Sequence, residues 1–283
     1  MNKLKRILGW PGIALHLVTL AILGMSCKKA AMSSLDDPRL AEAVFFPRPD
    51  NSAPPPGAKD YRIEVAPGVQ LAARHYVRSE NAPSILFFHG NGEIVPDYND
   101  LAFAFHDAGF NLFAVDYRGY GASTGEISLR GLSQDPPIVA DFFLKNIARG
   151  KPFVMGRSLG SSPACDIALR YGSQFRGLIL ESGFADVNPL LSLLGADLPE
   201  PAREEAARLF SNDHKLAKIR IPVLILHGER DLLISPAHAR LNYASIPQGQ
   251  GTLKIIPGVG HNDMFRAADQ YFAALRAFST AAK

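Results

Sequence analysis

The pentapeptide Gly-Arg-Ser-Leu-Gly at residues 156–160 constrains the fold more than any other stretch of this chain. An apolar run at 153–155 leads into it, and a helix-forming segment at 164–171 follows. A strand, a sharp turn and a helix in this order form a nucleophile elbow, whose strained backbone lifts the serine hydroxyl clear of the sheet edge. Ser158 is therefore the candidate nucleophile. The Leu159 N–H, at a helix N-terminus, lies where developing negative charge is stabilised.

A second match to the Gly-x-Ser-x-Gly pattern, Gly-Ala-Ser-Thr-Gly at residues 121–125, offers Ser123 as a rival nucleophile. This copy follows a turn-rich segment at 117–120 rather than an apolar strand. No apolar helical pattern begins directly behind it. We therefore interpret Ser123 as a loop residue and Ser158 as the nucleophile.

Short apolar runs alternate with helical patterns along the chain, after a β-hairpin expected at 61–65 and 70–77. This alternation predicts an α/β fold with a mostly parallel central sheet and helices on both faces. Active sites of such sheets lie at the carboxyl ends of the strands. The expected strands are 84–88, 111–115, 153–155, 177–180, 223–226 and 253–256, and the expected helices are 101–108, 129–147, 164–171, 236–244 and 264–278.

Two loops after predicted strands supply the acid and the base that a serine nucleophile needs. His-Gly-Glu-Arg-Asp at 227–231 places Asp231 near the active edge, with Glu229 as the alternative acid. His261 lies in a glycine-rich loop after the last strand, so it is the candidate base. We interpret the other histidines considered, His75, His106, His214 and His238, as structural or solvated.

The loop after the expected strand at 84–88 reads His-Gly-Asn-Gly. An acyl-transfer site needs hydrogen-bond donors for the tetrahedral oxyanion, and the Leu159 N–H is one of them. We expect the Asn91 N–H to be the other, with His89 bracing the loop. The alternative is a glycine turn without a catalytic role.

Five motifs occur in the order of a known family: His-Gly-Asn-Gly at 89–92, Asp-Tyr-Arg-Gly-Tyr-Gly-Ala-Ser at 116–123, Gly-Arg-Ser-Leu-Gly at 156–160, Leu-His-Gly-Glu-Arg-Asp at 226–231 and Gly-Val-Gly-His-Asn-Asp at 258–263. Over about residues 44–280 the chain resembles a small-cap α/β-hydrolase of the serine aminopeptidase-like branch, near the α/β-hydrolase domain-containing proteins. The resemblance implies a metal-free serine hydrolase whose triad positions match Ser158, Asp231 and His261.

The resemblance does not determine the substrate, because the branch includes esterases, thioesterases and peptidases. We expect cleavage of a small-molecule acyl ester through an acyl-enzyme intermediate. The alternatives are cleavage of a peptide amide or an acyl-protein thioester, and a non-catalytic binding protein on the same fold.

Composition and motif spacing argue against several other classes of protein. A formal net charge of +3 over 283 residues is too small to indicate nucleic-acid binding. No Gly-x-Gly-x-x-Gly follows a predicted strand and no metal-ligand spacing occurs, so we expect neither a cofactor nor a metal. Two cysteines, one of them in the N-terminal segment, imply no disulfide framework.

Residues 1–27 have the features of a targeting segment. Basic residues precede an uncharged stretch, and its continuous part at 13–25 has the length of a signal-peptide core. The ending Leu-Gly-Met-Ser-Cys resembles a bacterial lipoprotein signal with Cys27 as the lipidated residue, although Leu23 stands one place further from the cysteine than usual. The alternatives are an uncleaved membrane anchor and a cleaved secretory signal. All three place the catalytic domain outside the cytoplasm.

The remaining chain is expected to form a tether and one domain. Residues 28–60 are polar and rich in proline, as in a linker. Residues 61–283 would form the α/β-hydrolase domain. Within it, 184–219 offers two helical patterns, 187–194 and 204–210, and no strand pattern, so we expect a small helical cap over the active edge.

Overall fold

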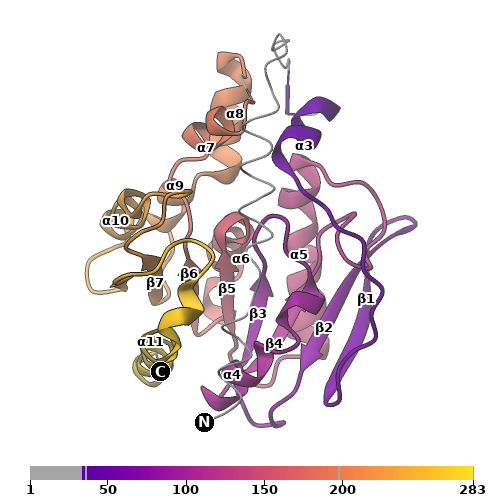
Figure 1. The fold of residues 1–283 in the computed structure, drawn as a ribbon, viewed down its shortest axis with the longest axis vertical. Coiled ribbons are helices and arrows are strands. Elements are labelled where there is room, and N and C mark those ends of the chain that lie inside the picture. The colour runs from indigo at the N-terminus through magenta and orange to yellow at the C-terminus, as the bar shows by residue number, and fades with distance from the viewer. Residues whose placement is uncertain (1–33, 36, 197, 283) are drawn as a thin grey trace.

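The computed structural model describes residues 34–35, 37–196 and 198–282, and its centre is a single twisted sheet (Figure 1). The described strands follow the order β1-β2-β4-β3-β5-β6-β7-β8. The β1–β2 and β2–β4 pairs are antiparallel, and every pair from β4 to β8 is parallel. The predicted α/β-hydrolase architecture is therefore confirmed. The strands are β1 Ala58–Ala66, β2 Val69–Tyr76, β3 Ser84–Phe88, β4 Asn111–Val115, β5 Phe153–Arg157, β6 Gly177–Glu181, β7 Val223–Gly228 and β8 Gly251–Ile256.

Helices cover both faces of this sheet. One face packs against α5 (Leu129–Asn146), α6 (Ser161–Tyr171) and α10 (Pro236–Ser245), and the other against α4 (Ala102–Asp107) and α11 (Ala268–Ala281). Strand β3 shows why both faces need a cover. Its side chains alternate between the two cores, with Leu86 and Phe88 in one and Ile85 and Phe87 in the other. Parallel strands that are apolar on both sides must be buried on both sides.

The expected cap lies between β6 and β7 and consists of α7 (Asn188–Leu193), α8 (Glu200–Phe210) and α9 (Asn212–Leu216). Helix α8 begins four residues before the predicted 204, because a proline in its first turn has the backbone angle that a helix start requires. Helix α9 was not predicted. With only five residues it is too short to show a helical repeat in the sequence.

Residues 38–50, which the sequence analysis assigned to the linker, are instead packed on the domain, whereas residues 51–57 are mostly exposed. Helix α3 (Pro38–Val44) begins at an N-cap aspartate and buries Leu40 and Val44, four residues apart on one helix face. Phe45 is 3% exposed and belongs to the same core as α5 and α6. The proline-rich composition predicted a linker, and for this reason the short helix α3 was not predicted. Helix α3 lies at the same end of the molecule as α7 and α8 (Figure 1).

The predicted targeting segment at residues 1–27, including Cys27, lies outside the described residues, as does the first part of the predicted linker. Among the helices that the structure describes, none combines the length and the apolar character needed to cross a membrane.

Candidate active site

The turn after β5 holds Ser158 in a left-handed backbone conformation, with φ at 51°. This conformation is unfavourable for a residue with a side chain and is the strained geometry of a nucleophile elbow. The flanking glycines are required by close packing. A Cβ at Gly156 would collide with the Gly160 carbonyl, and one at Gly160 would collide with the Phe88 carbonyl. The turn, and with it the start of α6, therefore lies directly against the neighbouring strand.

His261 and Asp231 meet Ser158 in one line of hydrogen bonds. His261 Nε2 lies 3.0 Å from Ser158 Oγ, and His261 Nδ1 lies 2.7 Å from Asp231 Oδ2. Because an ionised carboxylate only accepts, Nδ1 carries the proton and Nε2 is free to accept the serine proton. Burial lowers the pKa of His261, and the hydrogen bond to Asp231 opposes this shift. The arrangement can deprotonate the serine hydroxyl.

The Asp231 carboxylate is held from several sides. The backbone N–H groups of Leu233 and Ile234 donate to its Oδ1 over 3.0 and 2.8 Å. His227 Nε2 lies 3.2 Å from Oδ2 and 2.8 Å from the Ile234 carbonyl oxygen. Burial alone would raise the pKa of Asp231, but the hydrogen bonds from His227 and His261 hold it well below its usual range. The carboxylate is therefore kept charged beside His261.

Two of the residues considered from the sequence lie apart from this line. Glu229, the alternative acid, is exposed and accepts the N–H of Gly258 at 3.0 Å. Ser123 lies in the loop after β4, where its Oγ accepts the Ala72 N–H at 2.8 Å. Among the residues that the structure describes, neither side chain forms a hydrogen bond with Ser158, His261 or Asp231.

The loop at residues 89–93, called the oxyanion loop hereafter because the sequence predicts an oxyanion donor in it, brings Asn91 to the same cavity as Leu159 and Ser158. Leu159 lies in the first helical turn after β5, where backbone N–H groups lack an acceptor within the helix. The Asn91 side chain is hydrogen-bonded to the backbone of Val44 and Phe46. Its Nδ2 donates to the Val44 carbonyl at 2.5 Å, and its Oδ1 accepts from the Phe46 N–H at 3.1 Å. With its side chain engaged in these bonds, Asn91 still lies at the wall of the cavity beside Ser158 and Leu159.

His89 ties the oxyanion loop to the sheet, in the bracing position expected from the sequence. Its Nδ1 lies 2.8 Å from the Gly90 carbonyl oxygen, and its Nε2 lies 3.3 Å from Asp116 Oδ1. The Tyr117 hydroxyl donates to the His89 carbonyl at 2.7 Å. The ring therefore packs between the loop and Asp116 at the end of β4, and Tyr117 fixes the backbone of the loop.

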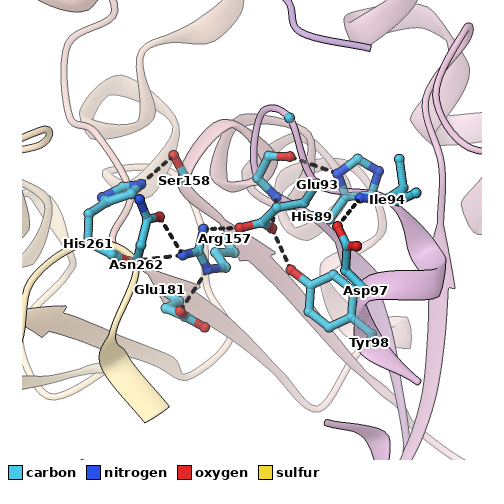
Figure 2. Close-up of polar contacts among 12 residues, drawn as sticks. His89, Glu93, Ile94, Asp97, Tyr98, Arg157, Ser158, Glu181, His261 and Asn262 are labelled. Carbon is cyan, nitrogen blue, oxygen red and sulfur yellow. Dashed lines mark hydrogen bonds and ion pairs between the residues drawn. The ribbon is translucent and has the colours of Figure 1, made fainter. Parts of the chain in front are cut away.

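A buried charge cluster around Arg157, the residue before Ser158, connects the loops of the site (Figure 2). The guanidinium contacts Glu93 of the oxyanion loop at 2.5 Å and Glu181 at the end of β6 at 3.1 Å. It also donates to the His261 carbonyl oxygen at 2.9 Å. Burial alone would raise the pKa of Glu93, but Arg157 and the hydroxyl of Tyr98 keep it lowered. A buried charge needs such partners to remain charged.

Sequence reasoning missed Arg157, Glu93, Glu181 and His227. Arg157 occupies the variable position of the pentapeptide, and no spacing rule connects it to two glutamates on other loops. His227 stands in the His-Gly step at the end of β7, which is the one local signal that could have found it.

The line of hydrogen bonds opens into a cavity with a volume of about 850 Å³, including its mouth. Its walls come from the cap, from α5, from the loop after β7 and from the segment after α3. No aspartate or glutamate is among the described residues that line it. The apolar lining side chains are Val44, Phe46, Leu129, Leu132, Leu159, Phe184, Val187, Leu190, Leu191, Leu194, Phe210, Leu233 and Ile234.

Known proteins share both the sequence pattern and the architecture. The α/β hydrolase domain-containing protein aho-3 of Caenorhabditis elegans is 32% identical over 203 residues, which are 69% of this chain and 57% of that protein. Protein bem46 of Schizosaccharomyces pombe is 27% identical over 203 residues, 70% of this chain and 68% of that protein. The match thus leaves a substantial part of each relative uncovered.

The solved structure of a Pyrococcus furiosus esterase matches with a TM-score of 0.69 at 17% identity and covers 84% of this chain and 99% of that chain. At this identity the likeness shows a shared fold. The family described as serine aminopeptidase, S33, matches residues 79–215 and 204–265, a span that contains Asn91, Ser158, Asp231 and His261. The chain therefore belongs to the S33 serine aminopeptidase family of α/β-hydrolases.

Proposed function

We propose that the protein is a serine hydrolase that cleaves carboxylic esters with an apolar acyl group. The observation that carries this proposal is the line of hydrogen bonds from Asp231 through His261 to Ser158 at the wall of an apolar cavity. A serine hydroxyl becomes nucleophilic at neutral pH when an oriented base accepts its proton.

In the proposed reaction, Ser158 Oγ attacks the carbonyl carbon while His261 Nε2 takes the hydroxyl proton. Asp231 holds the Nδ1–H tautomer and stabilises the imidazolium that forms. The backbone N–H groups of Leu159 and Asn91 donate to the oxyanion. His261 then gives its proton to the leaving alcohol, which leaves an acyl group on Ser158. Water, deprotonated by His261, releases the carboxylic acid and restores the serine.

The lining of the cavity favours esters over aminoacyl amides. An aminopeptidase substrate carries an α-ammonium group, which needs a carboxylate partner once it is removed from water. The described lining residues include none, and the nearby carboxylates of Glu93 and Glu181 are already paired with Arg157. A thioester with the same acyl group is the second candidate, because an apolar cavity recognises the acyl chain rather than the leaving atom.

The test compares p-nitrophenyl esters with aminoacyl anilides as substrates of the purified protein. We expect ester turnover that Ser158→Ala reduces by at least ~10³-fold, because triad members act as a unit. Ser123→Ala is the matched control and should retain turnover. Faster hydrolysis of the anilides, or turnover that survives Ser158→Ala, would contradict the proposal.

A further inference from the structure

Residues 44–50, hereafter the strap, run from the last residue of α3 past the oxyanion loop and are hydrogen-bonded to it. The Asn91 side chain bridges the strap backbone, donating to the Val44 carbonyl and accepting from the Phe46 N–H. Arg48 Nε donates to the Gly92 carbonyl oxygen at 2.8 Å, and Arg48 also forms an ion pair with Asp97. The strap is thus held on the loop by three side-chain interactions.

The far end of the strap is also attached to the domain. Residue Gly121 donates its N–H to the Arg48 carbonyl at 2.8 Å, and its own carbonyl accepts the Asp50 N–H at 3.0 Å. The Tyr120 hydroxyl accepts from the Phe46 N–H at 3.0 Å and donates to Asn91 Oδ1 at 2.7 Å. Backbone bonds on both sides of Phe46 therefore fix its position against the domain.

The strap also forms part of the cavity wall. Val44 and Phe46 line the cavity together with Ser158 and the leucines of the cap. Val44 is 4% exposed, whereas Phe46 is only half-buried and borders the cavity beside Asn91. Because hydrogen bonds hold the strap backbone in place, the space for a ligand next to the strap depends on the size of the Val44 and Phe46 side chains.

We propose that the strap is a specificity element of the active site, in which Phe46 limits the length of the acyl group and Asn91 couples the strap to the oxyanion donor. This inference rests on the proposed esterase function. Asn91 would serve both purposes, because its side chain holds the strap and its backbone N–H donates to the oxyanion in the proposed reaction. A displaced strap therefore shifts the donor, and a misplacement of about 1 Å can cost up to ~10²-fold in rate.

Side-chain size at Phe46 provides the first test, measured as kcat/KM across p-nitrophenyl esters of increasing chain length. Phe46→Ala should move the optimum to longer chains, with a gain of about fourfold per newly buried methylene. Phe46→Trp should move it to shorter chains. General damage to the fold would lower all esters together and would not produce opposite shifts. Phe103→Ala, which removes a half-exposed phenylalanine of α4 outside the cavity lining, is the control.

The coupling to the oxyanion loop is tested with Arg48→Met. We expect kcat to fall by roughly tenfold, within the ~10²-fold limit for a misplaced group, while KM changes little. Arg62→Met removes one positive charge from an exposed arginine of β1 and should leave both constants unchanged. Arg48→Lys should restore part of the rate, because it keeps the ion pair with Asp97.

The outcomes separate this inference from the function on which it rests. If the wild type hydrolyses esters in a Ser158-dependent manner but both Phe46 variants keep its chain-length profile, the strap is not a specificity element and the esterase proposal stands. If the wild type hydrolyses none of the esters, both are overturned. Opposite shifts of the optimum in the Phe46 variants, with a selective fall of kcat in Arg48→Met, are the predicted result.

Discussion

The two Gly-x-Ser-x-Gly pentapeptides of this chain have the same pattern and different surroundings. The copy at 156–160 connects β5 to α6, and Ser158 has φ at 51° with its hydroxyl 3.0 Å from His261. The copy at 121–125 lies in the loop between β4 and α5, where Ser123 accepts a backbone N–H from β2. Ser158 is hydrogen-bonded to His261 at the cavity, whereas Ser123 is hydrogen-bonded to the backbone of β2.

The glycines of the two copies also have different tasks. Gly156 and Gly160 allow the turn to lie against the strands. Gly121 and Gly125 have positive φ values of 52° and 79° and allow the loop to turn, and a Cβ at Gly121 would collide with Asp116. The Gly-x-Ser-x-Gly pattern alone therefore does not define a nucleophile elbow. A nucleophile elbow also requires a buried strand before the pentapeptide and a helix after it.

The largest effect on the proposed chemistry, after loss of the nucleophile, is expected at the acid. Asp231→Asn should slow ester turnover by about 10⁴-fold, because an amide can stabilise the wrong tautomer of His261. Glu229→Gln is the matched control and should retain turnover, since Glu229 is exposed and bonded to Gly258. Circular dichroism should show an unchanged fold. A loss of activity in the Glu229 variant instead would assign the acid role to Glu229.

One arginine precedes Ser158 directly, and another lies in the same loop as Ser123, so their removal should have different effects. Arg157→Met should destabilise the fold by about 3–5 kcal/mol, because it leaves Glu93 and Glu181 buried without their partner. It should also lower kcat by up to ~10²-fold through movement of the loops that it connects. Arg118 lies in the loop of Ser123 and is paired with Asp135 of α5. Arg118→Met should lower the stability of the fold and leave kcat within about threefold of the wild-type value. Thermal melts and steady-state kinetics of both variants measure this difference.

The pH dependence of kcat/KM follows from the burial of His261. Only the neutral imidazole can accept the serine proton, so activity is present above the pKa of His261 and is lost as the pH falls through it. Burial lowers this pKa below its ordinary value of 6.5, so the acidic limb should have its midpoint below pH 6.5. Below that midpoint, kcat/KM should decline by about tenfold per pH unit. A midpoint above 6.5 would contradict the environment described for His261.

The smallest expected effects concern stability and have opposite signs at the two serines. Ser123→Ala should cost about 1 kcal/mol, because it leaves the Ala72 N–H without its side-chain acceptor. Ser158→Gly should stabilise the fold by up to about 1 kcal/mol, since glycine tolerates the left-handed conformation. Chemical denaturation of the two variants measures both values. Equal destabilisation by both changes would remove the distinction between a strained and a relaxed serine.

Much of the fold and the line of hydrogen bonds could be predicted because the determining signals are local. Apolar runs mark the strands, and the candidate groups at Ser158, Asp231 and His261 each follow one of them in a turn. Parallel strands carry these turns to one edge of the sheet without any knowledge of long-range contacts.

The remaining features depend on contacts between distant segments. Arg157 meets Glu93, Glu181 and the His261 loop only in the folded chain, and no spacing in the sequence connects them. The strap was assigned to a linker because its composition is rich in proline, whereas its place is set by the Asn91 side chain, 45 residues away from Phe46. Proline content indicates that a segment tends to be extended, but hydrogen bonds to distant residues can still fix that segment on the domain.

Whether Ser158 or Ser123 is the nucleophile is tested most directly by identifying which serine reacts with a fluorophosphonate probe. The purified protein is labelled, digested and sequenced by mass spectrometry, with heat-denatured protein as the control. We expect a single modified peptide, with the probe on Ser158, and no label on the denatured chain. A probe on Ser123, or equal labelling of folded and denatured protein, would contradict the claim that the surroundings of the pentapeptide, rather than its pattern, make the nucleophile.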